Sequence, residues 1–512
     1  MILRYLCGIF IVGCGEATLV SPLGRAYLQR SSEDVDGLKH DVGSGGWRSR
    51  RPIRVIAAYL VMVAAAAAIV LLVRKYGETL VAGSPSAQSA LGSSEGSSDW
   101  LLHLLIALAA IILLGNILAK LFARIHQPPV IGQVVAGILL GPSLLGLRFS
   151  GWILPESVAP HLAAVAQLGI VIYMFMVGLE LNPSLLKKRG YAVLVISHAS
   201  ILLPFVLGVA LALVLYPRLA PSNVGFTSFS LFMGVALSIT AFPVLARILS
   251  DYRLTKTRLG VLALGCAAVG DFTAWCLLAF VVGVVKAKAG TGIVVIIEAL
   301  AYISLMFFAV RPLLTRLVGR WEQREHTGSL FVSLLLLMLA SAAVTEAIGI
   351  HAIFGAFLAG AIIPHDSAVA RRLTGQLKGV VMTVLLPAFF AFAGLQTRVD
   401  LLSSWALWLM FGLILAVAVI GKFGGTYAAS RLTGLRRGGA AMLSTLMNTR
   451  GLMELIVLSV GLNLGVIGPE LYTIMVLMAL ATTALTSPVL HRLMKRATPA
   501  ELAELLTEGE QS

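Results

Sequence analysis

Long apolar segments separated by short polar loops constrain the fold of this chain more than any other feature. A helix that crosses the hydrocarbon core of a bilayer needs about 20 mainly apolar residues. Charged residues make up only 12% of the 512 residues, which is too few to cover a water-facing surface and excludes a soluble enzyme. The sequence therefore predicts an all-α polytopic membrane protein with 13 core transmembrane helices and one N-terminal hydrophobic helix. The predicted spans are 54–73, 101–123, 129–147, 160–181, 190–216, 227–249, 258–285, 292–310, 329–347, 351–364, 379–396, 404–430, 438–463 and 469–491.

Lysine and arginine residues are distributed unequally over the loops and gather in every second one. Because cytoplasmic loops of membrane proteins are rich in these residues, this pattern predicts a cytoplasmic C-terminus in a bacterial inner membrane. The net charge of +15 is then mostly a signal of topology, and we expect a lipid bilayer, not nucleic acid, as the partner. The basic loops include Lys187, Arg253, Arg320, Arg371, Arg436 and Lys495, whereas the opposite loops include Arg148, Arg218, Lys286 and Arg398.

The chain divides into five segments. Residues 1–53 are predicted to be a disordered extension, and 54–73 is either a retained transmembrane helix or a cleaved signal sequence. Residues 74–100 form a Ser/Gly-rich linker, 101–496 form the transmembrane domain, and 497–512 form a short cytoplasmic tail.

Two pieces of sequence recur with opposite orientation in the predicted topology. Ile131–Pro142 resembles Ile353–Pro364, and Met174–Leu181 resembles Phe389–Gln396. An inverted repeat is typical of secondary transporters, whose substrate site lies near the middle of the bilayer between broken helices. The alternative is a chance similarity between glycine-rich helices. The repeats would cover 101–285 and 329–496, joined by the linker helix 292–310, and the matched positions are Gly132 with Gly355, Gly137 with Gly360, and Gly178 with Gly394.

Two ionisable residues lie deep inside predicted spans, where an unpaired charge is costly. Asp271 lies at the middle of its span, and we expect it to bind the transported ion or proton. Lys422 lies at comparable depth and would provide a counter-charge for the empty site; the alternative is a lysine that snorkels to the interface. Glu180 and Glu346 lie near the ends of spans, and we expect them at the mouth of the pathway or at an interface.

The span 227–249 contains residues that favour a broken helix. Pro243 deprives the Ile239 carbonyl of its helical donor. Freed carbonyls together with the hydroxyls of Ser238 and Thr240 would then offer oxygen ligands to an alkali cation, although a simple proline kink is an alternative.

The span 438–463 is the counterpart in the second half. Gly451 allows this helix to unwind, close to Asn448. Arg450 and Glu454 are four residues apart on one helix face, so they either support the transport site or form a self-satisfying ion pair. The sequence contains neither a zinc-ligand spacing nor a nucleotide-binding loop, so we expect no cofactor and no metal other than a transported alkali cation.

Several short motifs occur in order along residues 100–495. They are His126–Gln133, Ala136–Ser143, Val177–Glu180, Ala267–Asp271, Thr273–Trp275, Gly349–Ala352, Phe354–Phe357, Gly421–Lys422 and Met447–Leu452. They resemble the monovalent cation:proton antiporter-2 family, which includes bacterial potassium efflux antiporters and plant cation/proton exchangers. The resemblance implies a homodimer with an interface domain and a mobile core domain that carries crossed broken helices. It also implies that Asp271 binds cation and proton in alternation.

The chain departs from this family in two places. Many relatives have Asp, Asn or Gln immediately before the essential aspartate, whereas this chain has Gly270, which leaves the ion choice and the stoichiometry open. The tail after Arg496 is short, so we expect no nucleotide-binding regulatory domain.

The function expected from these features is the exchange of a monovalent cation, K⁺ or Na⁺, for protons by alternating access. Cation and proton compete for one carboxylate, which favours electroneutral one-for-one exchange. An uncoupled, channel-like cation pathway and a transporter of organic solutes on the same fold are the alternatives, and the second would use Arg450 to bind an anion.

Overall fold

The computed structural model describes residues 52–82, 100–125, 127–141, 155, 158–180, 190–255, 257–286, 292–322, 327–364 and 367–497. Most of the predicted N-terminal extension, most of the linker and nearly all of the tail lie outside these ranges. Within them every regular element is a helix, and eleven helices are long and apolar enough to cross a membrane. The all-α polytopic class is therefore confirmed.

Three apolar helices are shorter than the predicted spans. They are α5 (Pro129–Leu140), α15 (Ala352–Ala361) and α20 (Leu452–Asn463), with 12, 10 and 12 residues. A helix of this length rises about 15–18 Å, roughly half of the thickness of a hydrocarbon core. The helix α5 covers 129–140 of the predicted span 129–147, of which 142–147 lie outside the described residues, and α15 covers 352–361 of the predicted span 351–364.

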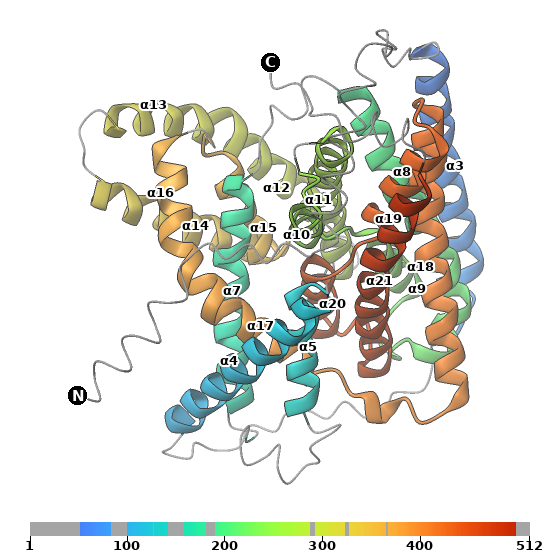
Figure 1. Cartoon of the computed structure of the whole chain (residues 1–512), viewed down its shortest axis with the longest axis horizontal. Helices are drawn as coiled ribbons and strands as arrows, with labels where there is room; N and C mark the ends of the chain where they lie inside the picture. Colours follow the sequence, from blue (N-terminus) through green and yellow to red (C-terminus); the bar gives the residue numbers. More distant parts are fainter. Residues whose placement is uncertain are drawn as a thin grey trace. The chain divides into compact units, whose positions relative to one another are not determined.

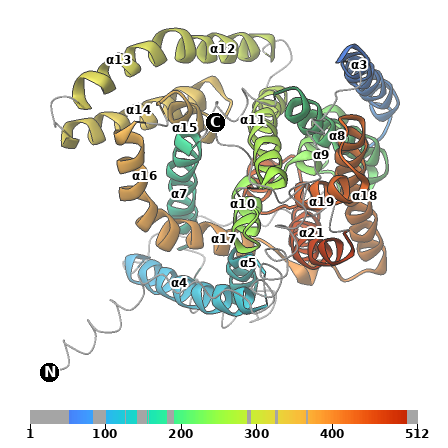
Figure 2. The ribbon, with the colours of Figure 1, turned by 45° about the horizontal axis from the view of Figure 1, so that its top comes forward.

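The described helices form two groups, which lie on opposite sides of both ribbon views (Figures 1 and 2). The panel group consists of α4 (Trp100–Arg124), α5, α7 (Ala159–Glu180), α14 (Thr327–Ile348), α15, α16 (Ala368–Val380), the π-helical turn η4 (Val381–Leu385) and α17 (Leu386–Leu395). The crossing group consists of α8 (Gly190–Leu219), α9 (Phe226–Ser238), α10 (Phe242–Asp251), α11 (Arg258–Lys286), α18 (Trp405–Leu432), α19 (Arg437–Met447), α20 and α21 (Pro469–Arg496). The elements α12 (Gly292–Leu305), η3 (Met306–Val310) and α13 (Arg311–Glu322) connect the first half of the chain to the second.

The glycines matched between the two repeats make equivalent contacts in the panel group. A Cβ atom at Gly137 of α5 would overlap the carbonyl of Ala391 in α17, and a Cβ atom at Gly360 of α15 would overlap the carbonyl of Phe175 in α7. When Gly178 is aligned with Gly394 in the second repeated piece, Phe175 is aligned with Ala391. A Cβ atom at Gly394 would likewise overlap the Val134 carbonyl, and one at Gly178 would overlap the Phe357 carbonyl. A Cβ atom at Gly132 would overlap the backbone of Leu118, and one at the matched Gly355 would overlap the carbonyl of Ser341. Close backbone approach therefore occurs at corresponding positions of the two repeated pieces.

Two π-helical turns precede prolines by the same distance. η3 ends at Val310, two residues before Pro312, and η4 ends at Leu385, two residues before Pro387. Proline has no N–H to donate, and its ring pushes against the carbonyl four residues earlier. A wider π turn accommodates both effects, so the helical direction continues through each proline.

The N-terminal hydrophobic segment forms α3 (Pro52–Gly77), which packs on α8 and α9. Val73 is buried in this contact, and Gly77 lies against the ring of Phe226. Just beyond the helix, the Thr227 hydroxyl donates to Glu78 Oε1 at 3.1 Å. These contacts attach α3 to the first turn of α9, which is the first half of a broken helix.

Candidate functional site

Two broken helices cross in the middle of the crossing group. Ile239–Ala241 are extended between α9 and α10, and Asn448–Gly451 separate α19 from α20. The two interruptions touch, because Ala241 N–H donates to the Thr449 carbonyl at 3.0 Å. The hydroxyl of Thr240 also donates to the carbonyl of Met447, at 3.2 Å. Both predicted broken helices are thus present, and they meet backbone to backbone.

Local sequence explains where each helix stops. Pro243 is the second residue of α10, a position where its missing N–H has no helical partner to lose. The interruption at residues 239–241 is therefore a true break, not a proline kink in a continuous helix. Gly451 has a φ of 155°, which a residue with a Cβ atom rarely adopts, and α20 starts at the next residue.

The C-terminal end of α9 receives two positively charged side chains. Arg450 Nη1 donates to the carbonyl of Ala236 at 3.2 Å, and its Nη2 donates to the carbonyl of Leu237 at 2.6 Å. Lys422 Nζ donates to the next carbonyl, that of Ser238. The last carbonyls of a helix have no helical donors and carry the negative end of its dipole, so two cations stabilise this end of α9.

A buried ion pair lies directly after the second break. Arg450 Nη1 donates to Glu454 Oε1 at 3.0 Å, and both side chains are fully buried. Glu454 also lies in the first turn of α20, where a negative charge is favourable. The second oxygen of Glu454 has no hydrogen-bond partner within the described residues. Arg450 therefore joins both breaks: its backbone belongs to one, and its guanidinium binds the end of α9 at the other.

Asp271 lies in the middle of α11 and is only 5% exposed. Its Oδ1 atom has no hydrogen-bond partner in the part of the chain that the structure describes. Lys422 of α18 is also fully buried, and its Nζ lies at the end of α9 beside the guanidinium of Arg450, since the two bind neighbouring carbonyls. The Oδ1 atom of Asn448, at the second break, is likewise buried and unpaired among the described residues. The site thus combines two buried cations, two buried carboxylates and unpaired oxygen atoms.

The first break has a partner that the sequence did not indicate. The Ser238 carbonyl, next to the Ile239 carbonyl of the prediction, accepts from Lys422 Nζ. The hydroxyls of Ser238 and Thr240 both donate to backbone carbonyls, that of Ser238 to Val235 at 2.8 Å. The sequence shows which carbonyls a break releases, but it does not show that cationic side chains from distant helices occupy them.

The two glutamates expected near the ends of spans lie apart from the crossing. Glu346 accepts a hydrogen bond from Ala352 N–H at 2.8 Å and so caps the start of α15. Glu180 is the last residue of α7, and its side chain lies outside the described residues.

Sequence reasoning did not identify Thr483 of α21 as part of the site. Its hydroxyl accepts from Arg450 N–H at 3.1 Å and donates to the Arg450 carbonyl at 2.5 Å. The signal in the sequence was a pair of adjacent threonines, Thr482 and Thr483, inside a mainly apolar helix.

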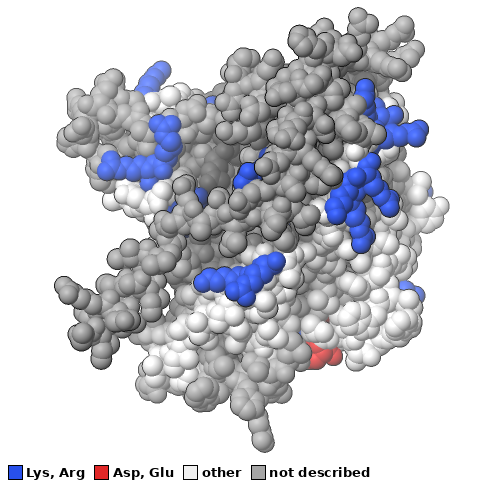
Figure 3. All heavy atoms as spheres, viewed as in Figure 1, with Lys and Arg blue, Asp and Glu red and all other residues white. Residues whose placement is uncertain are grey.

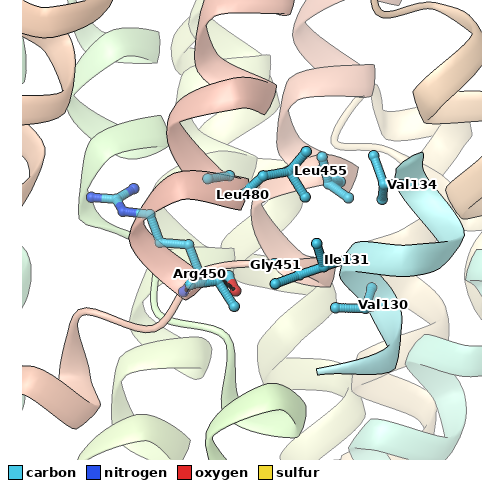
Figure 4. Close-up of a pocket in the computed structure, with 9 residues that line it drawn as sticks. Val130, Ile131, Val134, Arg450, Gly451, Leu455 and Leu480 are labelled. Atoms are coloured by element: carbon cyan, nitrogen blue, oxygen red, sulfur yellow. Dashed lines mark hydrogen bonds between the residues drawn. The ribbon is translucent and has the colours of Figure 1, made fainter. Parts of the chain in front are cut away.

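Two small apolar gaps separate the crossing group from the panel group. The first is lined by Val130, Ile131 and Val134 of α5 on one side and by Arg450, Gly451, Leu455, Ala479, Leu480 and Thr483 on the other. Figure 4 shows that the guanidinium of Arg450 is directed away from this gap, so that only its backbone side lines it. The second gap lies between α11, α20 and the start of α15, and its lining includes Trp275, Ala279, His351 and Phe354. Trp275 and Ala279 follow Asp271 by one and two helical turns on the same face of α11.

Known proteins resemble this chain over most of its length. A family model described as "Sodium/hydrogen exchanger, transmembrane" matches residues 105–496. The Na(+)/H(+) antiporter NhaS4 of Synechocystis sp. is 42% identical over 402 residues, which cover 77% of this chain and 98% of that protein. The K(+)/H(+) antiporter 1 of Saccharomyces cerevisiae is 33% identical, over 77% of this chain and 46% of that protein.

Cation/H(+) antiporter 17 of Arabidopsis thaliana is 39% identical over 75% of this chain and 48% of that protein. The chain therefore spans nearly all of the cyanobacterial relative but about half of the plant and yeast relatives. The solved structure of the sodium proton antiporter MjNhaP1 from Methanocaldococcus jannaschii matches 80% of this chain and 100% of that chain, with 15% identity and a TM-score of 0.49.

The family match includes both broken helices, Asp271, Lys422 and the ion pair of Arg450 with Glu454. It also agrees with the resemblance carried by the short motifs. The chain belongs to the sodium/hydrogen exchanger family of membrane proteins.

Proposed function

We propose that this chain is a secondary transporter that exchanges a monovalent cation, K⁺ or Na⁺, for protons, with Asp271 binding cation and proton in turn. The observation that carries the proposal is a buried carboxylate with an unpaired oxygen, on a helix (α11) that packs against α9, α10 and α19 of the two broken helices. A buried charge inside a membrane protein is costly and is usually kept for a function. The relatives named as cation/H(+) antiporters support the same reaction.

Two of the oxygen atoms that could bind a cation belong to side chains. Asp271 Oδ1 and Asn448 Oδ1 are unpaired in the described structure, and an alkali cation prefers such hard oxygen ligands. The Ser238 carbonyl would join them only if Lys422 withdrew. Position 270 leaves space beside the aspartate, because a Cβ atom there would meet only Ser197 Oγ, at 3.5 Å. We infer that water can complete the coordination shell at this position.

Lys422 explains how the empty site can be tolerated. When neither cation nor proton is bound, the Asp271 carboxylate is charged and Lys422 compensates part of that charge. A bound cation or proton neutralises the carboxylate in a similar way. Exchange follows if the loaded site moves between the two sides of the membrane more readily than the empty one, since cation and proton then take turns on one carboxylate.

The two apolar gaps support movement of the crossing group against the panel group. Both gaps are lined mainly by apolar side chains. Movement would have to break the hydrogen bonds that cross between the groups, such as those from Tyr472 O–H to the Ala393 carbonyl at 3.1 Å and from Gln127 Nε2 to the Ala484 carbonyl at 3.2 Å. The second gap follows the face of α11 that carries Asp271, and we propose it as the route from the site toward the Lys286 end of α11.

Sidedness and assembly follow from the same proposal. Lysine and arginine side chains of the described surface gather over the upper part of the view in Figure 3. This agrees with a cytoplasmic C-terminus in a bacterial inner membrane.

We also propose a homodimer, with repeats bounded by 101–285 and 329–496 in each chain. The helix α3 remains in the mature protein because of its contacts with α8 and α9. The chain is then a transporter and not an enzyme.

The test is proton flux in proteoliposomes, read by a pH dye while K⁺, Na⁺ or a large control cation is added. Cation-dependent proton movement is expected in the wild type, and Asp271→Asn should abolish it while leaving a monodisperse protein. Asp251→Asn removes a carboxylate of the same type from an exposed surface position and should leave exchange unchanged.

Full activity of the Asp271→Asn variant would refute the assignment of the site. Cation flux that persists without any proton movement would instead indicate an uncoupled pathway. If the wild type moves no protons with any alkali cation, transport of organic solutes is the alternative function to test.

A further inference from the structure

The second break leaves the backbone of Arg450 outside both neighbouring helices. α19 ends at Met447 and α20 begins at Leu452, so the N–H and carbonyl of Arg450 have no partner from a regular helix. Both groups are buried, and an unpaired buried backbone group costs free energy comparable to a lost hydrogen bond. Their partners therefore decide whether this break keeps a single conformation.

One side chain satisfies both groups. The hydroxyl of Thr483, which is 1% exposed, accepts from Arg450 N–H at 3.1 Å and donates to the Arg450 carbonyl at 2.5 Å. A hydroxyl can do this because it carries one donor and two acceptor sites. Elsewhere in the break, the Thr449 carbonyl accepts from Ala241 N–H of the first break, and the Thr449 N–H donates back to the Leu446 carbonyl of α19. Thr483 thus fixes the break from a separate helix, α21.

The neighbouring threonines of α21 do not behave in this way. The hydroxyl of Thr482 donates to the carbonyls of Met478 and Ala479, and that of Thr486 donates to the carbonyl of Thr482. These bonds remain inside α21, as is usual for threonine in an apolar helix. Thr482 is as deeply buried as Thr483, so it provides a matched control.

We propose that Thr483 is a positioning residue for cation exchange, a proposal that rests on the proposed function. Its hydroxyl holds the Arg450 backbone by two hydrogen bonds, and the position of the backbone determines how far the guanidinium reaches. The guanidinium then reaches the Ala236 and Leu237 carbonyls at the end of α9. Without the hydroxyl, the Arg450 N–H and carbonyl lose their hydrogen-bond partner. The ends of α9 and α19 at the crossing are then held less firmly relative to each other, and the site binds the cation less well.

The experiment compares Thr483→Val, Thr483→Ser and Thr482→Val in the full-length protein. Proteoliposome flux gives the apparent KM for the cation and the maximal rate, and the shift of the thermal unfolding midpoint on adding K⁺ or Na⁺ gives binding without transport. Thr483→Val should raise the apparent KM by at least about fivefold, the effect of one lost hydrogen bond, and weaken the cation-induced shift. Thr483→Ser keeps the hydroxyl, and Thr482→Val leaves the crossing intact, so both should stay within about twofold of the wild type.

Three outcomes would overturn the proposal. In the first, folded Thr483→Val has the apparent KM and thermal shift of the wild type. In the second, Thr482→Val shows the same loss as Thr483→Val, which would indicate a general packing effect. If Thr483→Val does not fold, Thr483→Ala is measured in its place. The third outcome is that Thr483→Ala has the apparent KM and the cation-induced thermal shift of the wild type.

Failure of the proposed function is recognised separately. A wild type that is stabilised by a cation but moves no protons would overturn exchange, and Thr483 would then be judged by the thermal shift alone. Absence of both signals in the wild type would overturn both proposals.

Discussion

Glu454→Gln isolates the charge of the buried ion pair from its shape. Glutamine has nearly the same size and can still accept the hydrogen bond that Arg450 Nη1 donates at 3.0 Å. Arg450 keeps its positive charge, because a guanidinium is not deprotonated in proteins. The substitution therefore leaves a fully buried cation whose remaining charge compensation comes from the carbonyl dipoles at the end of α9.

The magnitude follows from the two interactions that change. Removing one partner of a buried ion pair costs about 3–5 kcal/mol. The amide oxygen of glutamine recovers about 1 kcal/mol by accepting from Arg450. We therefore expect the free energy of unfolding to fall by about 2–4 kcal/mol.

The assay is reversible unfolding in mixed micelles, titrated with a denaturing detergent and followed by tryptophan fluorescence. Asp251→Asn is the matched control, because Arg247 and Asp251 form an ion pair with the same sequence spacing at 3.1 Å but are more than half exposed. That variant should stay within about 0.5 kcal/mol of the wild type. A loss below about 1 kcal/mol for Glu454→Gln would refute the view that a desolvated ion pair holds the crossing.

Three further predictions concern packing, charge and competition. Gly360→Ala should destabilise the fold by about 1–3 kcal/mol, because its Cβ atom would overlap the Phe175 carbonyl. The control Gly375→Ala lies in open space on α16 and should be neutral or stabilising by about 0.5–1 kcal/mol. Equal thermal unfolding midpoints for the two variants would contradict this prediction. Lys422→Gln should keep a donor for the carbonyl at the end of α9 but lower the maximal exchange rate at least about tenfold, since the charge that balances Asp271 is lost. An unchanged flux would show that this charge is not needed. Acidifying the cation side should raise the apparent KM for the cation, by no more than about tenfold per pH unit, because both ligands compete for Asp271; a KM independent of pH would argue against one shared carboxylate.

Much of the fold could be predicted because the signals are local. The length and polarity of each apolar run predict a helix inside a membrane, and the glycines and prolines predict where helices break. Pro243 and Gly451 are examples: each lies within two residues of the start of a half-helix. Asp271 could be recognised in the same way, since a lone carboxylate in an apolar span is costly wherever the neighbouring helices lie.

The lengths of α5 and α15 could not be predicted in this way. Apolar residues continue past the end of each helix, so hydropathy alone does not show where the helix ends. The π turns before Pro312 and Pro387 were not predicted either, because a proline in an apolar segment is compatible with a kink, a break or a wider turn.

The sequence by itself determined that this chain is a polytopic helical protein with two broken helices and a buried carboxylate, because burial cost and helix propensity act over a few residues. Only the tertiary structure decided which groups meet at the crossing. Lys422 lies 184 residues from the Ser238 carbonyl that it binds, and Thr483 lies 33 residues from Arg450. Such pairs depend on the register of helices packed against each other. A hydrogen bond forms only within about 3 Å, a tolerance finer than any hydropathy pattern can specify.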